Sequence, residues 1–294
     1  MHIEYNECRL CARNCGVNRN SGRVGYCRAD YQMKICRAAL HLWEEPIISG
    51  ENGSGTVFFS GCSMRCIFCQ NSDISRASVG RTVTDDELAE IMLELQKKGA
   101  NNINFVTPTH FAPSIKAATE KARDLGLDIP TVYNTGSFDR VETVKALDGV
   151  IDIYLPDFMY YKEAISLKYS SAENYPSVAL DCIKEMVRQR PRPIIESGIM
   201  KSGVIIRLLL LPGHVAEAKL SLKKLYREFG ESVYYSLMGQ YTPTEALPAP
   251  LNRRVTLSEY REFVDYAAAL GVTNAFVQEL SSANTAYIPK FDTN

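Results

Sequence analysis

Membrane-spanning segments, a secretion signal and a strong net charge are all missing from this sequence. No apolar run approaches the length of a transmembrane helix, and residues 1–6 lack the basic-then-apolar pattern of a signal peptide. The net charge at pH 7 is −1, so the chain has no bulk field to attract nucleic acid or anionic lipid. Neither a tandem repeat nor a low-complexity linker is evident. These absences predict a cytoplasmic globular protein and argue against membrane or nucleic acid as a partner.

Cysteine, by contrast, is abundant: the 294 residues include nine, of which seven fall in two clusters that leave Cys36 and Cys182 apart. A secreted disulfide scaffold would be short and rich in loops, whereas this chain is long and 46% hydrophobic. An odd number of cysteines also argues against complete pairing. Clustered thiols in such a chain predict a reducing compartment and metal binding.

The segment 60–71 carries Cys62, Cys66 and Cys69 at the spacing C-x3-C-x2-C. It follows residues 55–59, where a glycine and then β-branched and aromatic residues predict a short buried strand. Iron–sulfur clusters are held by cysteine thiolates, and three ligands for four irons leave one iron open to a small molecule. The alternatives are a structural zinc loop, which needs a fourth ligand that does not follow closely, and core cysteines without a metal.

The second cluster lies in residues 1–49, which we predict to be an N-terminal Cys-rich metal-binding module. Its members are Cys8, Cys11, Cys15 and Cys27, at the spacing C-x2-C-x3-C-x11-C. Turn-forming asparagine and glycine stand between them instead of a packed core, so a metal would order the segment. Four thiolates suffice for tetrahedral zinc or for a second iron–sulfur cluster, and both remain open. An unmetallated tail is the alternative, and Cys36 is a possible replacement ligand.

Residues 50–294 show strand and helix patterns in alternation. The predicted strands cover 55–59, 102–107, 130–134, 150–155, 204–211 and 233–237, with 274–280 as a candidate final strand. The predicted helices cover 85–98, 113–125, 139–147, 162–170, 176–190, 215–228 and 257–270. Such alternation predicts an α/β fold with a parallel sheet and helices outside, here a partial (β/α)6 barrel. A flat doubly wound sheet is the alternative, but no glycine-rich phosphate loop follows the first strand. Residues 41–46 and 188–192 are interpreted as solvated turns without chemistry.

Polar residues gather where the predicted strands end, at the edge that also carries the cysteine loop. They are Thr107, Thr109, His110, Asn134, Asp157, Arg207 and Tyr241. Seven around one rim predict a ligand site, although His110 is equally explained as a surface or helix-capping residue. Arg207 is the only charge on its strand, so it must face an anion inside the barrel. That anion is either a ligand carboxylate or Asp157, in a pair that braces two strands.

The cysteine loop resembles the signature of the radical S-adenosylmethionine (SAM) superfamily, C-x3-C-x-aromatic-C, through Cys62, Cys66, Phe68 and Cys69. The resemblance implies a partial barrel of the radical SAM type, with a [4Fe-4S] cluster whose open iron binds SAM. It further implies reductive cleavage of SAM to methionine and a 5′-deoxyadenosyl radical, with Phe68 near the adenine. The seven rim residues then become candidates for the shell around SAM. A low-potential donor such as flavodoxin or ferredoxin would reduce the cluster.

Within this superfamily the chain resembles the branch of pyruvate formate-lyase activating enzyme, and in it an uncharacterised PflX-like subgroup. The segments that carry this resemblance are Cys69–Asn71, Tyr133–Thr135, Asp152–Asp157, Ile206–Arg207 with Leu211–Gly213, and Gln240–Pro243. Two positions differ from activating enzymes: Thr107–His110 stand in place of a Gly-Gly-Glu segment, and Met159 in place of a lysine.

The branch implies a glycyl radical enzyme as the substrate. The alternatives are a radical SAM enzyme acting on a small molecule or another macromolecule, and a two-cluster electron-transfer protein that does not use SAM.

Overall fold

The computed structural model describes residues 4–243, 246–278 and 291. One sheet runs through the molecule in the order β10-β9-β8-β6-β5-β4-β2-β1-β3. Its parallel strands are β2 (Ser54–Phe59), β4 (Ile103–Val106), β5 (Thr131–Thr135), β6 (Ile153–Pro156), β8 (Ile199–Leu209), β9 (Tyr234–Met238) and β10 (Ala275–Val277). The six predicted strands and the candidate final strand all form, although positions 279–280 of that last prediction lie outside the described residues. The predicted α/β fold with a parallel sheet and a Cys-rich N-terminal region is confirmed.

Three antiparallel strands were not predicted from the sequence. They are β1 (Met33–His41), which pairs with β2; β3 (Arg81–Val83), which pairs with β1; and β7 (Ile194–Glu196), which forms a hairpin with β8. The hairpin also makes β8 start earlier than residue 204, because Ser197 and Gly198 turn the chain at positive φ. Since β1 belongs to the main sheet, residues 33–41 pack with the barrel although they fall within the range assigned to the N-terminal module.

The helices follow the predicted alternation. They are α1 (Pro46–Ser49), α2 (Ser72–Ser75), α3 (Asp85–Lys97), α4 (Ala112–Asp124), α5 (Val141–Ala146), α6 (Glu163–Ser170), α7 (Tyr175–Gln189), α8 (Val215–Phe229) and α9 (Leu257–Leu270), with 3-10 turns η1 (Arg19–Ser21), η2 (Thr109–Phe111) and η3 (Gly230–Ser232). Capping boxes start α3 at Thr84 and α9 at Thr256, each with a glutamate three residues later. None of the described helices is long and apolar enough to cross a membrane.

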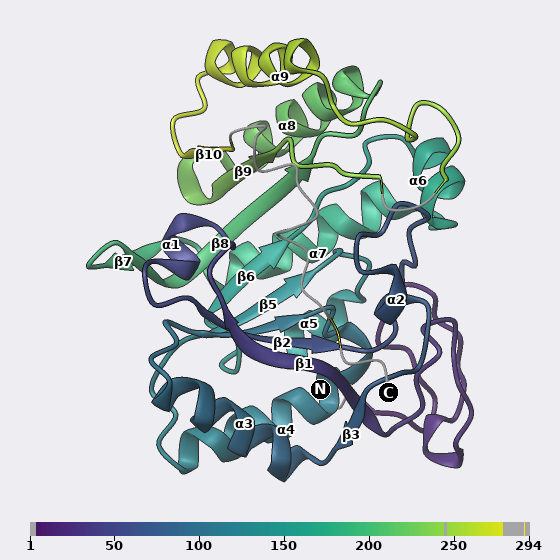
Figure 1. Cartoon of the computed structure of the whole chain (residues 1–294), viewed down its shortest axis with the longest axis vertical. Helices are drawn as coiled ribbons and strands as arrows, with labels where there is room; N and C mark the ends of the chain where they lie inside the picture. The colour runs from purple at the N-terminus through teal and green to yellow at the C-terminus, as the bar shows by residue number, and fades with distance from the viewer. Residues whose placement is uncertain (1–3, 244–245, 279–290, 292–294) are drawn as a thin grey trace.

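The two faces of the sheet bury different sets of side chains. Phe59, Phe105 and Tyr133 pack on the side of the long helices, in the largest core cluster. The opposite, inner face forms a separate cluster in which Val132, Ile153, Leu155 and Ile205 pack against Ile48 of α1. Helix α1 lies beside the start of β8, close to the β7 hairpin (Figure 1). It therefore covers the inner face near the amino ends of the strands, and the polar residues follow towards the carboxyl ends.

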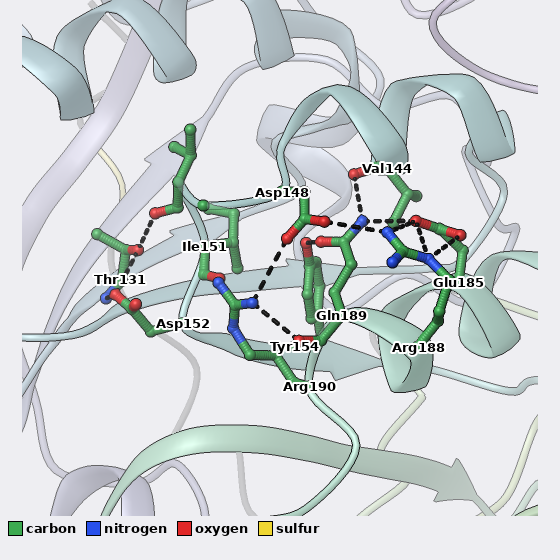
Figure 2. Close-up of polar contacts among 12 residues, drawn as sticks. Thr131, Val144, Asp148, Ile151, Asp152, Tyr154, Glu185, Arg188, Gln189 and Arg190 are labelled. Carbon is green, nitrogen blue, oxygen red and sulfur yellow. Dashed lines mark hydrogen bonds and ion pairs between the residues drawn. The ribbon is translucent and has the colours of Figure 1, made fainter.

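The basic turn at 188–192 belongs to a bracing network beside β6, a central strand of the sheet (Figure 2). Arg188 pairs with Glu185 and Asp148, and Arg190 pairs with Asp148 as well. Between them Gln189 is buried, and it bonds to the hydroxyl of Tyr154 and to the carbonyl of Val144. The prediction of a solvated turn was therefore wrong for Gln189: the segment ties α7 to β6 and α5.

Candidate functional site

The cysteine loop leaves the carboxyl end of β2 and is held from both sides. Nε2 of His110 lies 2.7 Å from the carbonyl oxygen of Ser60, and the amide of Gly61 donates to the carbonyl of Ile74. Gly61 has a φ of 84°, and a Cβ there would collide with the carbonyl oxygen of Cys27. Only glycine fits this position, because the backbone is left-handed and the N-terminal module approaches it closely.

The three thiols of this loop lie within electrostatic reach of one another. Cys66 is buried, its sulfur accepts a hydrogen bond from Ser170 Oγ at 3.0 Å, and Met159 Sδ lies 3.9 Å away. The sulfur of Cys62 accepts the amide of Met64 at 3.3 Å. Burial raises the pKa of the Cys62 thiol to about 11 and raises the pKa of Cys66 as well, and the neighbouring thiols add to both shifts.

This donor set fits an iron–sulfur cluster, because neighbouring thiolates, one of them buried and two partly buried, need a cationic centre to compensate their charge. Among the described residues, no three Cys, His, Asp or Glu side chains are close enough to hold a single metal ion. The ligands of a cluster bind different irons, so they are spaced more widely than the ligands of one ion.

Two aromatic residues that were predicted from the sequence come together beside the loop. The ring of Phe68 packs edge-on against Tyr241, with centroids 6.1 Å apart, and against Tyr169 at 6.3 Å. Both Phe68 and Tyr241 are buried, and the Tyr241 hydroxyl donates to the carbonyl of Leu251 at 2.7 Å. The hydroxyl therefore already has a backbone partner, and the ring faces form an apolar wall.

Most polar groups of the segment after β4 form contacts with other groups of the protein. Thr107 has a φ of 57°, and its amide donates to the carbonyl of Asn134. Thr109 Oγ1 lies 3.4 Å from Thr135 Oγ1 in a buried contact. Burial, together with the nearby Arg19 charge, lowers the pKa of His110 to about 3. The ring is therefore neutral, and it donates from Nε2 to Ser60, so Thr109 and His110 both have structural partners.

Arg207, Asp157 and Asn134, three of the predicted rim residues, meet on the inner face of the sheet. Arg207 Nε donates to Asp157 Oδ1 at 2.8 Å, and its Nη2 donates to Asn134 Oδ1. The third nitrogen, Nη1, lies 3.5 Å from Glu44 Oε2. Every nitrogen of the guanidinium therefore has a partner. The pair with Asp157 braces β6 against β8, as one of the two predicted roles of Arg207 required.

Glu44, Glu45 and Asn104 were missed in the sequence. The prediction of a solvated turn was wrong for the two glutamates: Glu45 is only 6% exposed, and Glu44 pairs with Arg207. Asn104 Nδ2 donates to Glu44 Oε1 at 3.1 Å. Burial raises the pKa of Glu44 to about 7 against the opposing effect of Arg207. The one signal in the sequence was Asn104, a polar residue at an inward position of the otherwise apolar strand β4.

The N-terminal module packs directly on the cysteine loop. Arg13 Nε donates to the carbonyl of Ser63 at 2.9 Å, and its Nη2 donates to the carbonyl of Ser170 at 2.8 Å. Cys11 forms an antiparallel bridge with Asp139, in the loop after β5. The module therefore covers part of the carboxyl edge of the sheet, where the rim residues lie.

Three of the module's cysteines are buried, and a buried arginine stands among them. Cys8, Cys11 and Cys27 are at most 7% exposed, whereas Cys15 is exposed. Arg19 is fully buried, and its Nη1 lies 3.8 Å from the sulfur of Cys8. The other contacts of the guanidinium include the carbonyls of Asp30 and His110 and the ring of Tyr5. No carboxylate pairs with Arg19 in the part of the chain that the structure describes.

Comparisons with known proteins bear on the same region. A family model described as the radical SAM superfamily matches residues 56–218, more than half of the chain. An uncharacterized protein of Methanocaldococcus jannaschii, MJ0674, is 30% identical over 274 residues, which cover 90% of this chain and 75% of that protein.

Two solved structures are also similar. The fold of HydG, a maturase of the [FeFe]-hydrogenase, matches 79% of this chain with a TM-score of 0.52 and 14% identity. The match takes in 54% of HydG, so this chain spans about half of its length. Methylornithine synthase (PylB) matches 81% of this chain and 74% of its own, with a TM-score of 0.46 and 12% identity.

Proposed function

The chain belongs to the radical SAM superfamily, and we propose that it is an enzyme that cleaves SAM reductively at a four-iron cluster held by Cys62, Cys66 and Cys69. The observation that carries the proposal is the meeting of these three thiols on one loop at the carboxyl end of β2, inside the region that the family model matches. When bound, the cluster supplies the electron that breaks the sulfonium bond and generates a carbon radical able to abstract hydrogen.

The chain's own residues position this chemistry and exclude water from it. Ser170 Oγ donates to the Cys66 sulfur, while Tyr160 shares a hydrogen bond with Ser170 and fixes that hydroxyl. Hydrogen bonds to a thiolate stabilise its charge, so this pair tunes the cysteine from the protein side. Phe68 and Tyr241 supply an apolar wall on which a planar adenine could pack.

The test is anaerobic reconstitution with iron and sulfide, followed by reduction with dithionite in the presence of SAM. The intact protein should carry a four-iron cluster and release 5′-deoxyadenosine. Cys62→Ala, Cys66→Ala and Cys69→Ala should each lose the cluster, whereas the matched control Cys36→Ala keeps it. A fully loaded, reduced cluster that releases no cleavage product would overturn the proposal and favour an electron-transfer protein.

For the substrate, we propose a glycyl position in a partner enzyme, with flavodoxin or ferredoxin as the reductant. The support is the resemblance of several strand-end segments to activating enzymes; the opposing observation is Met159, whose sulfur lies beside Cys66 where those enzymes have a lysine. If a glycyl radical enzyme is encoded beside the gene, incubating the reduced enzyme with it should produce a glycyl radical signal in electron paramagnetic resonance. Without that signal, a small molecule or another macromolecule is the better candidate.

We also propose that Cys8, Cys11, Cys15 and Cys27 bind a second metal centre. The support comes from Arg19, because a fully buried guanidinium without a carboxylate partner among the described residues needs another anion. The Cys8 sulfur is 3.8 Å away and would provide that anion as a thiolate. Thiolates in a buried site are stabilised by a bound metal. The spacing of these thiols suits an iron–sulfur cluster better than zinc, because no three of them, all within the described residues, are close enough to hold a single ion.

A further inference from the structure

The inner face of the barrel carries more negative charge than the described residues neutralise there. Arg207 faces three carboxylates, those of Asp157, Glu45 and Glu44. In the described part of the chain, no cation other than Arg207 forms an ion pair with Glu44 or Asp157. Even when Glu44 is protonated, the two carboxylates of Asp157 and Glu45 face one guanidinium, which leaves an excess of negative charge in a largely buried space and is costly unless a ligand compensates it.

Two buried polar atoms in the same place have no hydrogen-bond partner among the described residues. They are Oε2 of Glu45 and Oδ1 of Asn104, on side chains that are 6% and 0% exposed. With Glu44 ionised, the orientation of the Asn104 amide is fixed, since its Nδ2 donates to Glu44 and the reverse orientation would set two acceptors against each other. Both unpartnered atoms are acceptors, so the group that satisfies them must be a donor.

Strand register brings these groups to one face. Asn104 pairs in register with Val132, and Val132 pairs with Ile153, both in the inner apolar cluster that rests on α1. Asp157 and Arg207 are bridged to each other farther along the strands, towards the cysteine loop. Solvent reaches this end, because the side chains of Asp157 and Arg207 remain 23% and 12% exposed. Asn104 therefore lies beside the apolar floor, and the charged groups of Asp157 and Arg207 lie between it and the edge where SAM is proposed to bind.

We propose that the substrate of this enzyme carries a cationic group, an alkylammonium or a guanidinium, which binds on the inner face of the barrel between Glu44, Glu45 and the amide oxygen of Asn104. Such a group offers several N–H donors and a positive charge, and so meets both needs of the site. An anionic or neutral acceptor group would instead add to the repulsion. The inference rests on the proposed function only in taking the inner face as the substrate side.

A second source of cation is SAM itself, which carries a sulfonium and an ammonium group. The experiment separates the two sources by measuring the binding of SAM and the binding of a substrate-like cation independently. The reconstituted protein, without dithionite, is titrated by calorimetry with n-butylamine and with n-butanol, both with and without SAM. A lysine-containing glycyl peptide, acetyl-Gly-Lys-amide, forms a third arm that tests whether the cation belongs to a polypeptide.

In the intact protein we expect n-butylamine or the lysine peptide to bind at least tenfold more tightly than n-butanol. Glu45→Gln should abolish this preference while the affinity for SAM stays within twofold, and the exposed control Glu51→Gln should keep it. Glutamine keeps the size of the Glu45 side chain, and Oε2 of Glu45 makes no hydrogen bond within the described part of the chain that the variant would lose. An unchanged melting temperature of Glu45→Gln then shows that a lost preference does not come from unfolding.

Three results would overturn the inference: no preference for either cation over n-butanol, a preference that survives in Glu45→Gln, or a loss of SAM affinity in Glu45→Gln with cation binding unchanged. The last would assign the carboxylates to SAM. If the protein binds the cation but does not cleave SAM, the proposed function is wrong and the cation site is still supported. The failure of one proposal is therefore distinguishable from the failure of the other.

Discussion

Arg207 Nε donates to Asp157 Oδ1 at 2.8 Å and so joins β8 to β6 inside the barrel. Asp157 and Arg207 also form a backbone bridge beyond the end of β6. The ion pair therefore lies where the sheet would otherwise open. Because Asn134 and Glu44 bind the other two nitrogens, this guanidinium ties together β5, β6, β8 and the segment before α1.

Arg207→Lys should destabilise the protein, because an ammonium cannot keep three partners in three directions. Hydrogen bonds to charged groups contribute about 1.5–3 kcal/mol each, so losing two should lower the melting temperature by roughly 5–10 °C. The exposed control Arg192→Lys should leave it unchanged. Titration of both variants with SAM tests whether Arg207 also binds the carboxylate of the ligand. An unchanged dissociation constant in Arg207→Lys would leave Arg207 with a structural role only.

Glu44 should make stability depend on pH in the opposite sense from an ordinary paired carboxylate. Its pKa is raised to about 7, mainly by burial, so the folded protein binds a proton that the unfolded chain releases near pH 4.5. The contribution of Glu44 to the free energy of unfolding should therefore fall as pH rises from 4.5 to 7, by at most about 1.4 kcal/mol per pH unit. Chemical denaturation at several pH values should show this slope reduced in Glu44→Gln and retained in Glu51→Gln.

Gly61→Ala should disrupt the cysteine loop much more than a matched change elsewhere. Gly61 and Gly99 have φ values of 84° and 88°, but a Cβ at Gly99 meets nothing within 4 Å, whereas at Gly61 it collides with the Cys27 carbonyl. Gly99→Ala should cost only the conformational strain of about 1–2 kcal/mol. Gly61→Ala should in addition reduce iron content and displace the N-terminal module from the loop. Equal iron content in the two variants would show that the close contact is not required.

The double variant Cys8→Ala, Cys11→Ala should lose the metal of the N-terminal module and keep the barrel cluster, because the two cysteine sets lie on different segments. Elemental analysis for iron and zinc, with Cys36→Ala as the control, measures the loss and identifies the metal. Arg19 should then be left buried without its anion, so the variant should also be less stable than the control. Unchanged metal content would refute the second centre.

Local sequence patterns were sufficient for most of the architecture. The β-branched and aromatic run before Cys62, the acidic first turn of α3 and the glycines that end helices all act through the backbone within a few residues, so their effects could be predicted. The cysteine loop was predictable for the same reason, since its three thiols are fixed by spacing on one loop. The strand β1 was missed because it forms only by pairing with β2, and residues 33–41 show no strong period of their own.

The candidate site was predictable only where a single strand end decides the position. Asn134 and Arg207 lie near the carboxyl ends of the parallel strands β5 and β8, and Asp157 directly follows β6, so they were expected to meet, and they do. Glu44 and Glu45 enter the barrel because α1 folds back over the inner face, which depends on the contact of Ile48 with strands more than 80 residues away. The sequence by itself determined the parallel sheet and the cysteine loop; only the tertiary structure decided that two glutamates line the barrel, because burial is a property of the whole fold.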